Sequence, residues 1–233
     1  MVEPTAAALA SAAATSPVAV AEVAAESFSD DGPEIPWHIT PPPGRIAMQL
    51  RSTVRRVAVG AGLARKADLL AAVRALEGVP PVVTSPAGGT FIVGGEPWLG
   101  LCAIGSPRPG QPLPLDWMLR SLMAWFESAL QPYGIAPSAG RVDGAWCPGF
   151  SDIGVRGRKM IGLGFRITRE RVVMRGVMAV RPMPEADFDI LSACHRLIDA
   201  DVRRDSVISL AEATGRDGVD VESTIEAMRS AQT

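Results

Sequence analysis

The sequence predicts a protein of the α+β class. Short apolar segments typical of strands occur in groups, and helical patterns precede and follow these groups instead of alternating with them. Glycine or charged turns separate the later strands, which favours an antiparallel meander. A chain of 233 residues is long enough for one core of ordinary size. We therefore expect one domain built on a sheet with helices packed against it.

The N-terminal segment, residues 1–45, is expected to be a disordered tail and linker. It is rich in Ala, Ser and Pro, and such a composition buries little apolar surface per ordered residue. No Lys or Arg precedes its charge-free run, Pro4 to Ala21, which argues against a signal or transit peptide, and Pro17 interrupts the run. We expect a catalytic domain over residues 46–184 and a helical segment over residues 185–233 packed on the same domain.

The first half of the folded region predicts both strands and helices. Residues 56–60 form a short apolar run and predict a strand. Apolar residues at helical spacing predict a helix over residues 69–76, and Gly78 suits the left-handed position after it. Pairs of glycines divide residues 81–103 into short apolar runs, which predict strands joined by tight turns. The clearest helical pattern covers residues 115–130.

The second half predicts a meander followed by helices. Three strands are expected, over residues 152–156, 159–166 and 171–180. Apolar residues between Phe188 and Ile198 then fall on one face of a predicted helix. Ser209 and Glu212 have the spacing of a capping box and predict the start of another helix.

Composition excludes several classes of function. The 23 basic and 25 acidic residues nearly balance, and no basic stripe is interleaved with aromatic residues, so we expect neither a nucleic-acid nor a membrane partner. The three cysteines, Cys102, Cys147 and Cys194, are too few and too scattered for a disulfide framework or a zinc site, which favours a reducing cytoplasm. We interpret Cys102, in an apolar strand, and Cys194, on a helix, as structural residues.

The most informative stretch runs over residues 147–152 and 157–162, Cys-Pro-Gly-Phe-Ser-Asp and Gly-Arg-Lys-Met-Ile-Gly. It places a thiol, a carboxylate and a lysine in one supersecondary unit. A free thiol has a pKa of about 8.5 and is only a few per cent ionised at neutral pH unless a nearby cation helps. A hairpin between the two strands would fold Lys159 back toward Cys147. The stretch therefore predicts acyl transfer through a thioester.

Strand alternation gives Lys159 a predicted environment. The lysine would share its face with the apolar residues up to Phe165, and Gly162 and Gly164 would lie on the other face. An ammonium on a buried apolar face is costly unless it is paired or used, which makes Lys159 a functional candidate. It could hold an acyl carbonyl oxygen and stabilise the oxyanion, and the glycines would allow a ligand to approach closely.

Each of these residues also has an ordinary structural interpretation. A lone cysteine such as Cys147 is more often a small buried apolar residue than a nucleophile. A lysine at a hairpin end, such as Lys159, is more often a solvated charge that protects a strand edge. Asp152 could cap a turn. The combination of the three residues, more than any one of them, favours a functional role over a structural one.

This combination resembles the signature of the lipoate-protein ligase and octanoyltransferase superfamily, whose typical form is CPGxxDLxxxGRKxxGxxQR. With its cysteine, the chain is similar to the amidotransferases that move octanoyl or lipoyl groups from the glycine-cleavage H protein to lipoyl domains. The segment Val82 to Thr90 is similar to the family's loop of two arginines, a serine and glycines, against which the acyl chain lies. Residues 206–210 resemble the segment that leads into the terminal helices.

The resemblance implies a fold, site roles and partners. The fold would be of the biotin and lipoyl protein ligase type, a mixed sheet flanked by helices. Cys147 would carry the acyl thioester and Lys159 would contact the acyl carbonyl. The implied substrate-binding residues are Gly88, Gly89, Asp152 and Gly162. The acceptor would be a lysine of a lipoyl carrier protein, either the glycine-cleavage H protein or a lipoyl domain of a 2-oxoacid dehydrogenase. No metal or cofactor is required, because the octanoyl or lipoyl group is the substrate.

The sequence departs from the family pattern at three places. Thr84 and Ser85 replace the arginine pair, Phe150 stands where the cysteine branch usually has arginine, and Phe165 replaces a glutamine. Loss of the arginines removes positive charge that an adenylate phosphate would need, which disfavours an ATP-dependent lipoate-protein ligase. That ligase remains one alternative, and a degenerate, non-catalytic member that binds lipoyl-domain partners is the other.

The two histidines and one glycine-containing segment add little to this interpretation. No base for the acceptor amine is identified, because His38 lies in the linker and His195 lies mid-helix, and both are interpreted as structural or solvated. Val57 to Gly62 resembles the opening of a dinucleotide-binding fingerprint, but Arg65 replaces its third glycine and no regular alternation of strand and helix follows. We therefore favour the acyl-transfer interpretation.

Overall fold

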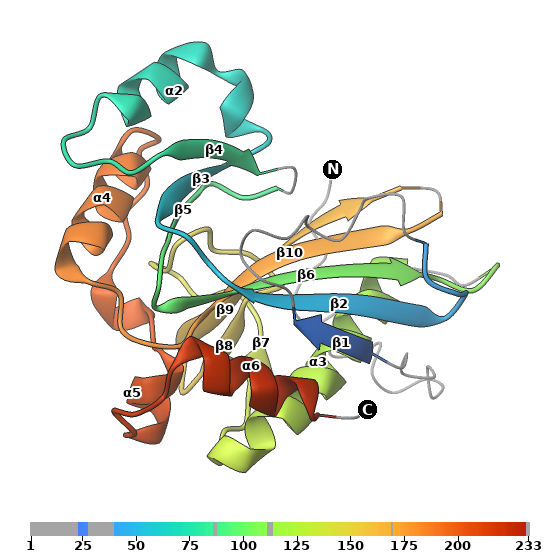
Figure 1. Ribbon diagram of the computed structural model, residues 1–233. Coiled ribbons are helices and arrows are strands. Elements are labelled where there is room, and N and C mark those ends of the chain that lie inside the picture. Colours follow the sequence, from blue (N-terminus) through green and yellow to red (C-terminus); the bar gives the residue numbers. More distant parts are fainter. Residues whose placement is uncertain (1–22, 28–39, 86–87, 111–113, 169, 232–233) are drawn as a thin grey trace.

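The computed structural model describes residues 23–27, 40–85, 88–110, 114–168 and 170–231. In these ranges the chain forms two β-sheets with helices around them (Figure 1). In chain order the elements are β1 (Val23–Ser27), β2 (Arg45–Ser52), β3 (Arg56–Gly60), η2 (Leu63–Arg65), α2 (Ala67–Arg74), β4 (Val82–Ser85), β5 (Phe91–Gly94), β6 (Trp98–Ser106), α3 (Pro114–Leu130), η3 (Gln131–Tyr133), β7 (Ser138–Ala139), β8 (Ile153–Val155), β9 (Arg158–Ile167), β10 (Val172–Ala179), α4 (Glu185–Arg196), η4 (Arg204–Ser206), α5 (Leu210–Thr214) and α6 (Val221–Arg229).

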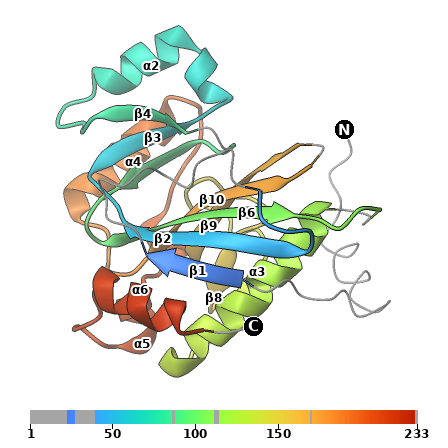
Figure 2. The ribbon, with the colours of Figure 1, turned by 45° about the vertical axis from the view of Figure 1, so that its right-hand side comes forward.

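The larger sheet has the strand order β1-β2-β6-β10-β9-β8-β7. Its third strand, β6, pairs antiparallel with both β2 and β10, and all of its residues are buried. Burial on both faces explains why this strand reads as a nearly continuous apolar run. One face packs against α3, α5 and α6 in the main hydrophobic core, as Figures 1 and 2 show from two directions.

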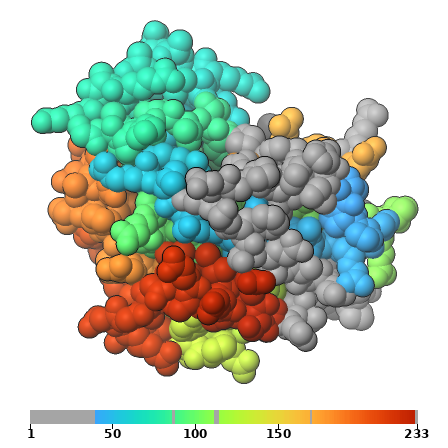
Figure 3. All heavy atoms as spheres, viewed as in Figure 1, coloured from blue at the N-terminus to red at the C-terminus, as the bar shows by residue number. Residues whose placement is uncertain are grey.

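The smaller sheet has the order β4-β3-β5 and lies over the other face of the larger sheet (Figure 2). In it β3 is parallel to β4 and antiparallel to β5, and α4 packs beside β5. A second hydrophobic cluster joins these elements to the larger sheet through Trp98 and Trp146, whose rings make an edge-to-face contact at 4.9 Å. In the space-filling view the small-sheet unit forms the upper part of the molecule and α5 and α6 the lower part (Figure 3).

Most of the predicted elements are confirmed. The meander forms as β8, β9 and β10 with antiparallel pairing, and the long helix forms as α3. At α5 the capping box is complete: the Ser209 N–H donates to Glu212 at 2.8 Å, and the Glu212 N–H donates to the Ser209 hydroxyl at 3.2 Å. The α+β class and the arrangement of a mixed sheet flanked by helices are therefore confirmed.

The structure differs from the sequence prediction within residues 1–45. Residues Val23–Ser27, predicted to lie in a disordered linker, form β1, which pairs in parallel with β2. An edge strand offers unpaired backbone N–H and C=O groups, and β1 pairs with β2 through such groups. Residues 1–22 and 28–39 of the predicted tail lie outside the described residues. In the described parts of the chain, every helix is too short or too polar to cross a membrane.

Candidate active site

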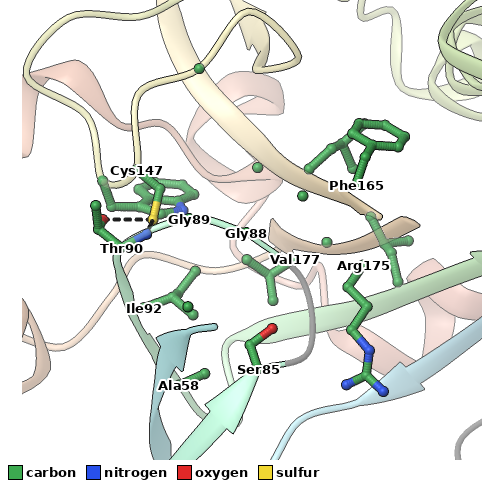
Figure 4. A pocket seen from close by; sticks show the side chains of 18 of the residues that line it. Ala58, Ser85, Gly88, Gly89, Thr90, Ile92, Cys147, Phe165, Arg175 and Val177 are labelled. Atoms are coloured by element: carbon green, nitrogen blue, oxygen red, sulfur yellow. Dashed lines mark hydrogen bonds between the residues drawn. The ribbon is translucent and has the colours of Figure 1, made fainter. Parts of the chain in front are cut away.

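A cavity of about 650 Å³ lies between the two sheets. Its walls come from β3, β4 and β5 on one side and from β6, β9 and β10 on the other, and the loop of residues 146–151 closes one end. Figure 4 shows Cys147 and Thr90 at that end, with Phe165 and Arg175 on the far side of the cavity. Ala58, Ile92 and Val177 give the space between them an apolar lining.

Cys147 is held against the start of β5 in a strained backbone conformation. Its φ of 44° lies in the left-handed region, which non-glycine residues rarely adopt and which is often found at functional sites. Its Sγ accepts a hydrogen bond of 2.7 Å from the backbone N–H of Thr90 and lies 2.7 Å from the Thr90 hydroxyl (Figure 4). The thiol is half-buried and lines the cavity. A reactive sulfur is thus fixed at the surface of the cavity.

Gly89 allows the backbone of Thr90 to lie close to the Cys147 sulfur. Its φ of 109° is unfavourable for any residue with a side chain, and a Cβ atom there would lie 3.2 Å from the Cys147 Sγ. The end of β3 also approaches closely, because a Cβ at Gly60 would lie 2.1 Å from the Gly89 carbonyl oxygen. The glycines of this loop therefore bring the backbone of Thr90 to the sulfur.

Lys159 is fully buried behind the cysteine loop. Its Nζ lies 2.6 Å from Asp152 Oδ1, and it donates to the carbonyl oxygens of Trp146 at 2.7 Å and Cys147 at 3.1 Å. These three acceptors match the three N–H groups of an ammonium. Lys159 Nζ also lies 4.8 Å from the centre of the Trp146 ring. The lysine therefore ties the backbone on both sides of the Trp146–Cys147 peptide bond to Asp152.

Asp152 completes this buried ion pair. Its second oxygen accepts the Gly149 N–H at 3.0 Å and the Val142 N–H at 3.5 Å. Burial raises the pKa of Asp152 and lowers the pKa of Lys159, because it disfavours both charges, and the charge of each partner opposes that shift. The pair is a rigid support for the loop that carries the thiol.

Comparison with known proteins places this chain in a family. A model described as the lipoyl protein ligase A/B catalytic domain matches residues 48–232. The chain belongs to this lipoyl protein ligase family. No curated protein sequence matches it significantly.

Solved structures share the fold of this lipoyl protein ligase domain at low sequence identity. Protein Ta0514 from T. acidophilum, with bound lipoic acid, is 16% identical with a TM-score of 0.57, over 79% of this chain and 69% of that one. A lipoate-protein ligase A bound with ATP is 18% identical with a TM-score of 0.57, and the match covers 79% of this chain and 70% of that one. The bi-partite lipoate protein ligase from Thermoplasma acidophilum, studied with its E2 lipoyl domain, is 15% identical with a TM-score of 0.53, over 79% and 68%.

The predicted site residues of the lipoyl protein ligase domain gather around one cavity, with one exception. Five of them line it: Gly88, Gly89, Cys147, Lys159 and Gly162. Asp152 does not line the cavity; it is buried behind Lys159. Both of its oxygens are occupied, one by the lysine and the other by backbone N–H groups, so in this structure Asp152 supports the loop from behind and its place among the substrate-binding residues stays a prediction.

The predicted burial of Lys159 is confirmed, but the residues that share its face differ from the prediction. Ile153 pairs with Ile161 but the next residue, Gly154, pairs with Lys159, so β9 has one residue more than β8 at this point. Such a bulge breaks the regular alternation of faces. Lys159 and Gly162 consequently face the same way, and a Cβ at Gly162 would lie 3.0 Å from the Lys159 Cε. Gly162 makes room for the lysine side chain.

Two residues near the sulfur were missed by sequence reasoning. Nε2 of His195 lies 2.9 Å from the Thr90 hydroxyl, and its Nδ1 lies 2.9 Å from the carbonyl oxygen of Leu191. The sequence interpretation of His195 was structural or solvated; the residue is buried, as a structural histidine is, and the sequence did not indicate its hydrogen bond to the residue that contacts Cys147. Because 105 positions separate Thr90 from His195, no local sequence signal could have joined them.

The cavity has positive charge despite the loss of the family's arginine pair. Thr84 and Ser85 line it where those arginines are expected, and Arg51, Arg56 and Arg175 line it from other strands. Burial lowers the pKa of Arg175, although an arginine remains charged. The positive charge absent from β4 is thus supplied to the same cavity by β2, β3 and β10.

Proposed function

We propose that this domain transfers an octanoyl or lipoyl group through a thioester on Cys147 to a lysine of a lipoyl carrier domain. The observation that carries the proposal is the position of the Cys147 sulfur, which lines the cavity and contacts both the N–H and the hydroxyl of Thr90. An N–H aimed at sulfur stabilises the thiolate, which is the attacking form.

The reaction has two balanced halves. In the first, the sulfur bonds to the acyl carbon as the bond from that carbon to the donor's leaving atom breaks, and the thiol proton goes to the leaving group. In the second, the acceptor lysine amine bonds to the same carbon, the C–S bond breaks, and an amine proton returns to the sulfur. The thioester route requires no cofactor or metal.

Lys159 is proposed to act on these steps by its charge. Its three N–H groups already have acceptors in the protein, so direct contact with the acyl carbonyl would require it to release one of them. Its ammonium lies behind Cys147 in a buried position, where a charge acts more strongly than in water. It would therefore stabilise the thiolate and the developing oxyanion while holding the loop in place.

The cavity and the structural relatives support the substrate and the partner. A volume of about 650 Å³ with an apolar lining falls in the range of small-molecule sites, which suits a medium-length acyl chain. The T. acidophilum relative holds lipoic acid, and the bi-partite ligase is described with its E2 lipoyl domain. Lipoyl domains of 2-oxoacid dehydrogenases and the glycine-cleavage H protein are the carriers we propose.

An ATP-dependent lipoate-protein ligase is the second candidate. The three arginines in the cavity favour it, because guanidinium groups bind phosphate oxygens well, and a structural relative binds ATP. In that reaction lipoate would be activated as an adenylate, and the sulfur of Cys147 would not carry the acyl group.

Intact-mass measurement separates these functions. The domain would be incubated with an octanoylated or lipoylated carrier protein, alongside Cys147→Ser and the control Cys194→Ala, whose side chain lies away from the cavity. The proposal predicts a gain of one acyl mass in the wild type and the control, mapped to Cys147, and no gain in Cys147→Ser. Lipoylation of a lipoyl domain that needs ATP and survives Cys147→Ser would establish the ligase instead. No modification and no transfer in any arm would indicate a non-catalytic member.

A further inference from the structure

A chain of hydrogen bonds leads from the reactive sulfur into the protein interior. Cys147 Sγ lies 2.7 Å from the Thr90 hydroxyl, which lies 2.9 Å from Nε2 of His195. Nδ1 of the same ring lies 2.9 Å from the carbonyl oxygen of Leu191, one turn earlier in α4. This row of hydrogen bonds joins three separate parts of the polypeptide: the loop before β8, the residue before β5, and α4.

The chemistry of its last member sets the direction of every hydrogen bond. A carbonyl oxygen only accepts, so the proton of the neutral His195 ring resides on Nδ1 and Nε2 is an acceptor. The Thr90 hydroxyl therefore donates its proton to Nε2. Its oxygen can then accept from the thiol of Cys147 at 2.7 Å, a shorter contact than the 3.5 Å from the thiol to the Phe91 carbonyl oxygen. The thiol proton has a continuous path to a ring nitrogen that can take it.

The surroundings of His195 keep the ring neutral near pH 7. The residue is 1% exposed, and its ring packs edge-on against Phe91 with the centroids 5.5 Å apart. Burial lowers its pKa, and the positive charge of Lys159 on β9 lowers it further. Strand β5, on which α4 packs, has the sequence Phe-Ile-Val-Gly and contributes no ionisable side chain. The preceding residue, Cys194, is a buried thiol whose pKa burial raises to about 11, so it is uncharged too.

Lys159 cannot serve as this base. In its ion pair with Asp152 the nitrogen is an ammonium without a lone pair, and its three N–H groups are taken by two carbonyl oxygens and one carboxylate oxygen. Its protons point at the loop backbone and at Asp152. The lysine supplies charge and support, and proton uptake needs another group.

We infer, on the basis of the acyl transfer proposed above, that Thr90 and His195 form a proton relay for Cys147. As the sulfur attacks the acyl carbon, the thiol proton passes to the Thr90 oxygen and the hydroxyl proton passes to Nε2 of His195. The relay then returns a proton from the Thr90 hydroxyl to the leaving group. In the second half the acceptor amine gives up a proton through Thr90 to His195 as it bonds to the acyl carbon, and the relay returns a proton to the sulfur as the C–S bond breaks. Thr90 lines the cavity, so its hydroxyl can reach a leaving nitrogen or sulfur there.

The two residues have different roles. Thr90 contacts the reacting sulfur and is the catalytic residue of the relay. His195 acts through Thr90, so it is a positioning residue that also holds the proton.

Valine has nearly the volume of threonine without its hydroxyl, and serine keeps the hydroxyl, which gives a matched pair of variants at position 90. Glutamine at position 195 keeps an acceptor for the threonine but takes up no proton at neutral pH.

The test measures how fast iodoacetamide alkylates Cys147 between pH 5.5 and pH 9.5, in wild type, Thr90→Val, Thr90→Ser and His195→Gln. We expect Thr90→Val and His195→Gln to react at least about tenfold more slowly than wild type at pH 7. The difference in alkylation rate between these two variants and wild type should disappear toward pH 9.5, where hydroxide in solution removes the thiol proton without the relay. Thr90→Ser should stay near the wild-type rate, which shows that the hydroxyl and not the fold is responsible.

Equal rates for Thr90→Val, His195→Gln and wild type at every pH would overturn the relay. An alkylation rate that is reduced by the same factor at every pH would overturn it too, because that result is expected when a substitution only shifts the packing around Cys147. Alkylation needs no acyl donor, so this readout is independent of the proposed function. If Cys147 is acylated but the variants are alkylated at the wild-type rate, the proposed transferase stands and the relay is rejected. If the variants show the expected alkylation pattern but Cys147 is not acylated, the relay stands and the proposed transferase is rejected.

Discussion

Lys159 Nζ lies 2.6 Å from Asp152 Oδ1, and both side chains are almost completely shielded from solvent. A buried ion pair is costly to break, because removal of one partner leaves the other charge without compensation. The pair also connects the site to the fold, since the same ammonium holds the carbonyl oxygens of Trp146 and Cys147.

Asp152→Asn is expected to lower the free energy of unfolding by about 3–5 kcal/mol, because it leaves Lys159 unpaired in the interior. Urea denaturation measures the change. The control is Asp143→Asn, which breaks an ion pair of 2.7 Å that is exposed to solvent. That variant should change stability by less than about 1 kcal/mol. Similar losses in the two variants would show that the buried pair has no special role.

Gly89→Ala is expected to destabilise the protein by about 1–3 kcal/mol and to disturb the cysteine, because the φ of 109° disfavours a side chain. The new Cβ would also lie 3.2 Å from the sulfur. Gly88→Ala is the matched control, since a Cβ there meets no atom within 4 Å. Thermal unfolding and the rate of Cys147 alkylation should both change at position 89 and change little at position 88. Equal effects at the two positions would contradict this account.

The three cysteines should differ in reactivity. Burial raises the pKa of Cys102 and of Cys194 to about 11, so little thiolate forms at either residue near pH 7.5. Cys147 is half-buried at the cavity wall. We expect iodoacetamide to modify Cys147 first in the native protein and all three residues in denaturant, as peptide mass mapping would show. Modification of Cys194 in the native protein as fast as Cys147 would disagree with the structure.

His195 should make stability depend on pH. Burial lowers its pKa in the folded state, whereas the unfolded chain has the ordinary value of about 6.5. Below that value the unfolded chain binds the proton and the folded protein does not, so this contribution is present above about pH 6.5 and is lost as the pH falls toward the folded-state pKa. Urea denaturation at pH 7.5 and pH 5.5 should show a larger loss for wild type than for His195→Gln. An equal or smaller loss in wild type would mean that His195 is not the group responsible.

Much of the fold was readable from the sequence because its signals are local. The apolar period of residues 115–130, the spacing of Ser209 and Glu212, and the turns of the meander each depend on residues a few positions apart. Strand β1 was not readable in this way, because its pairing uses backbone groups and leaves little trace in side-chain composition. The bulge in β9 was equally hidden, and it reversed the predicted face of Lys159.

The sequence by itself determined the class of the fold and the residues of the cysteine motif, because thiol, carboxylate and lysine lie within one short hairpin unit. Only the tertiary structure decided what each of them does. The register of the β8–β9 hairpin made Asp152 the partner of a buried lysine, and the packing of α4 against β5 brought His195 to Thr90 across 105 positions. The register depends on a bulge and the second contact on how distant segments pack against each other, and neither hydrophobic period nor motif spacing specifies these.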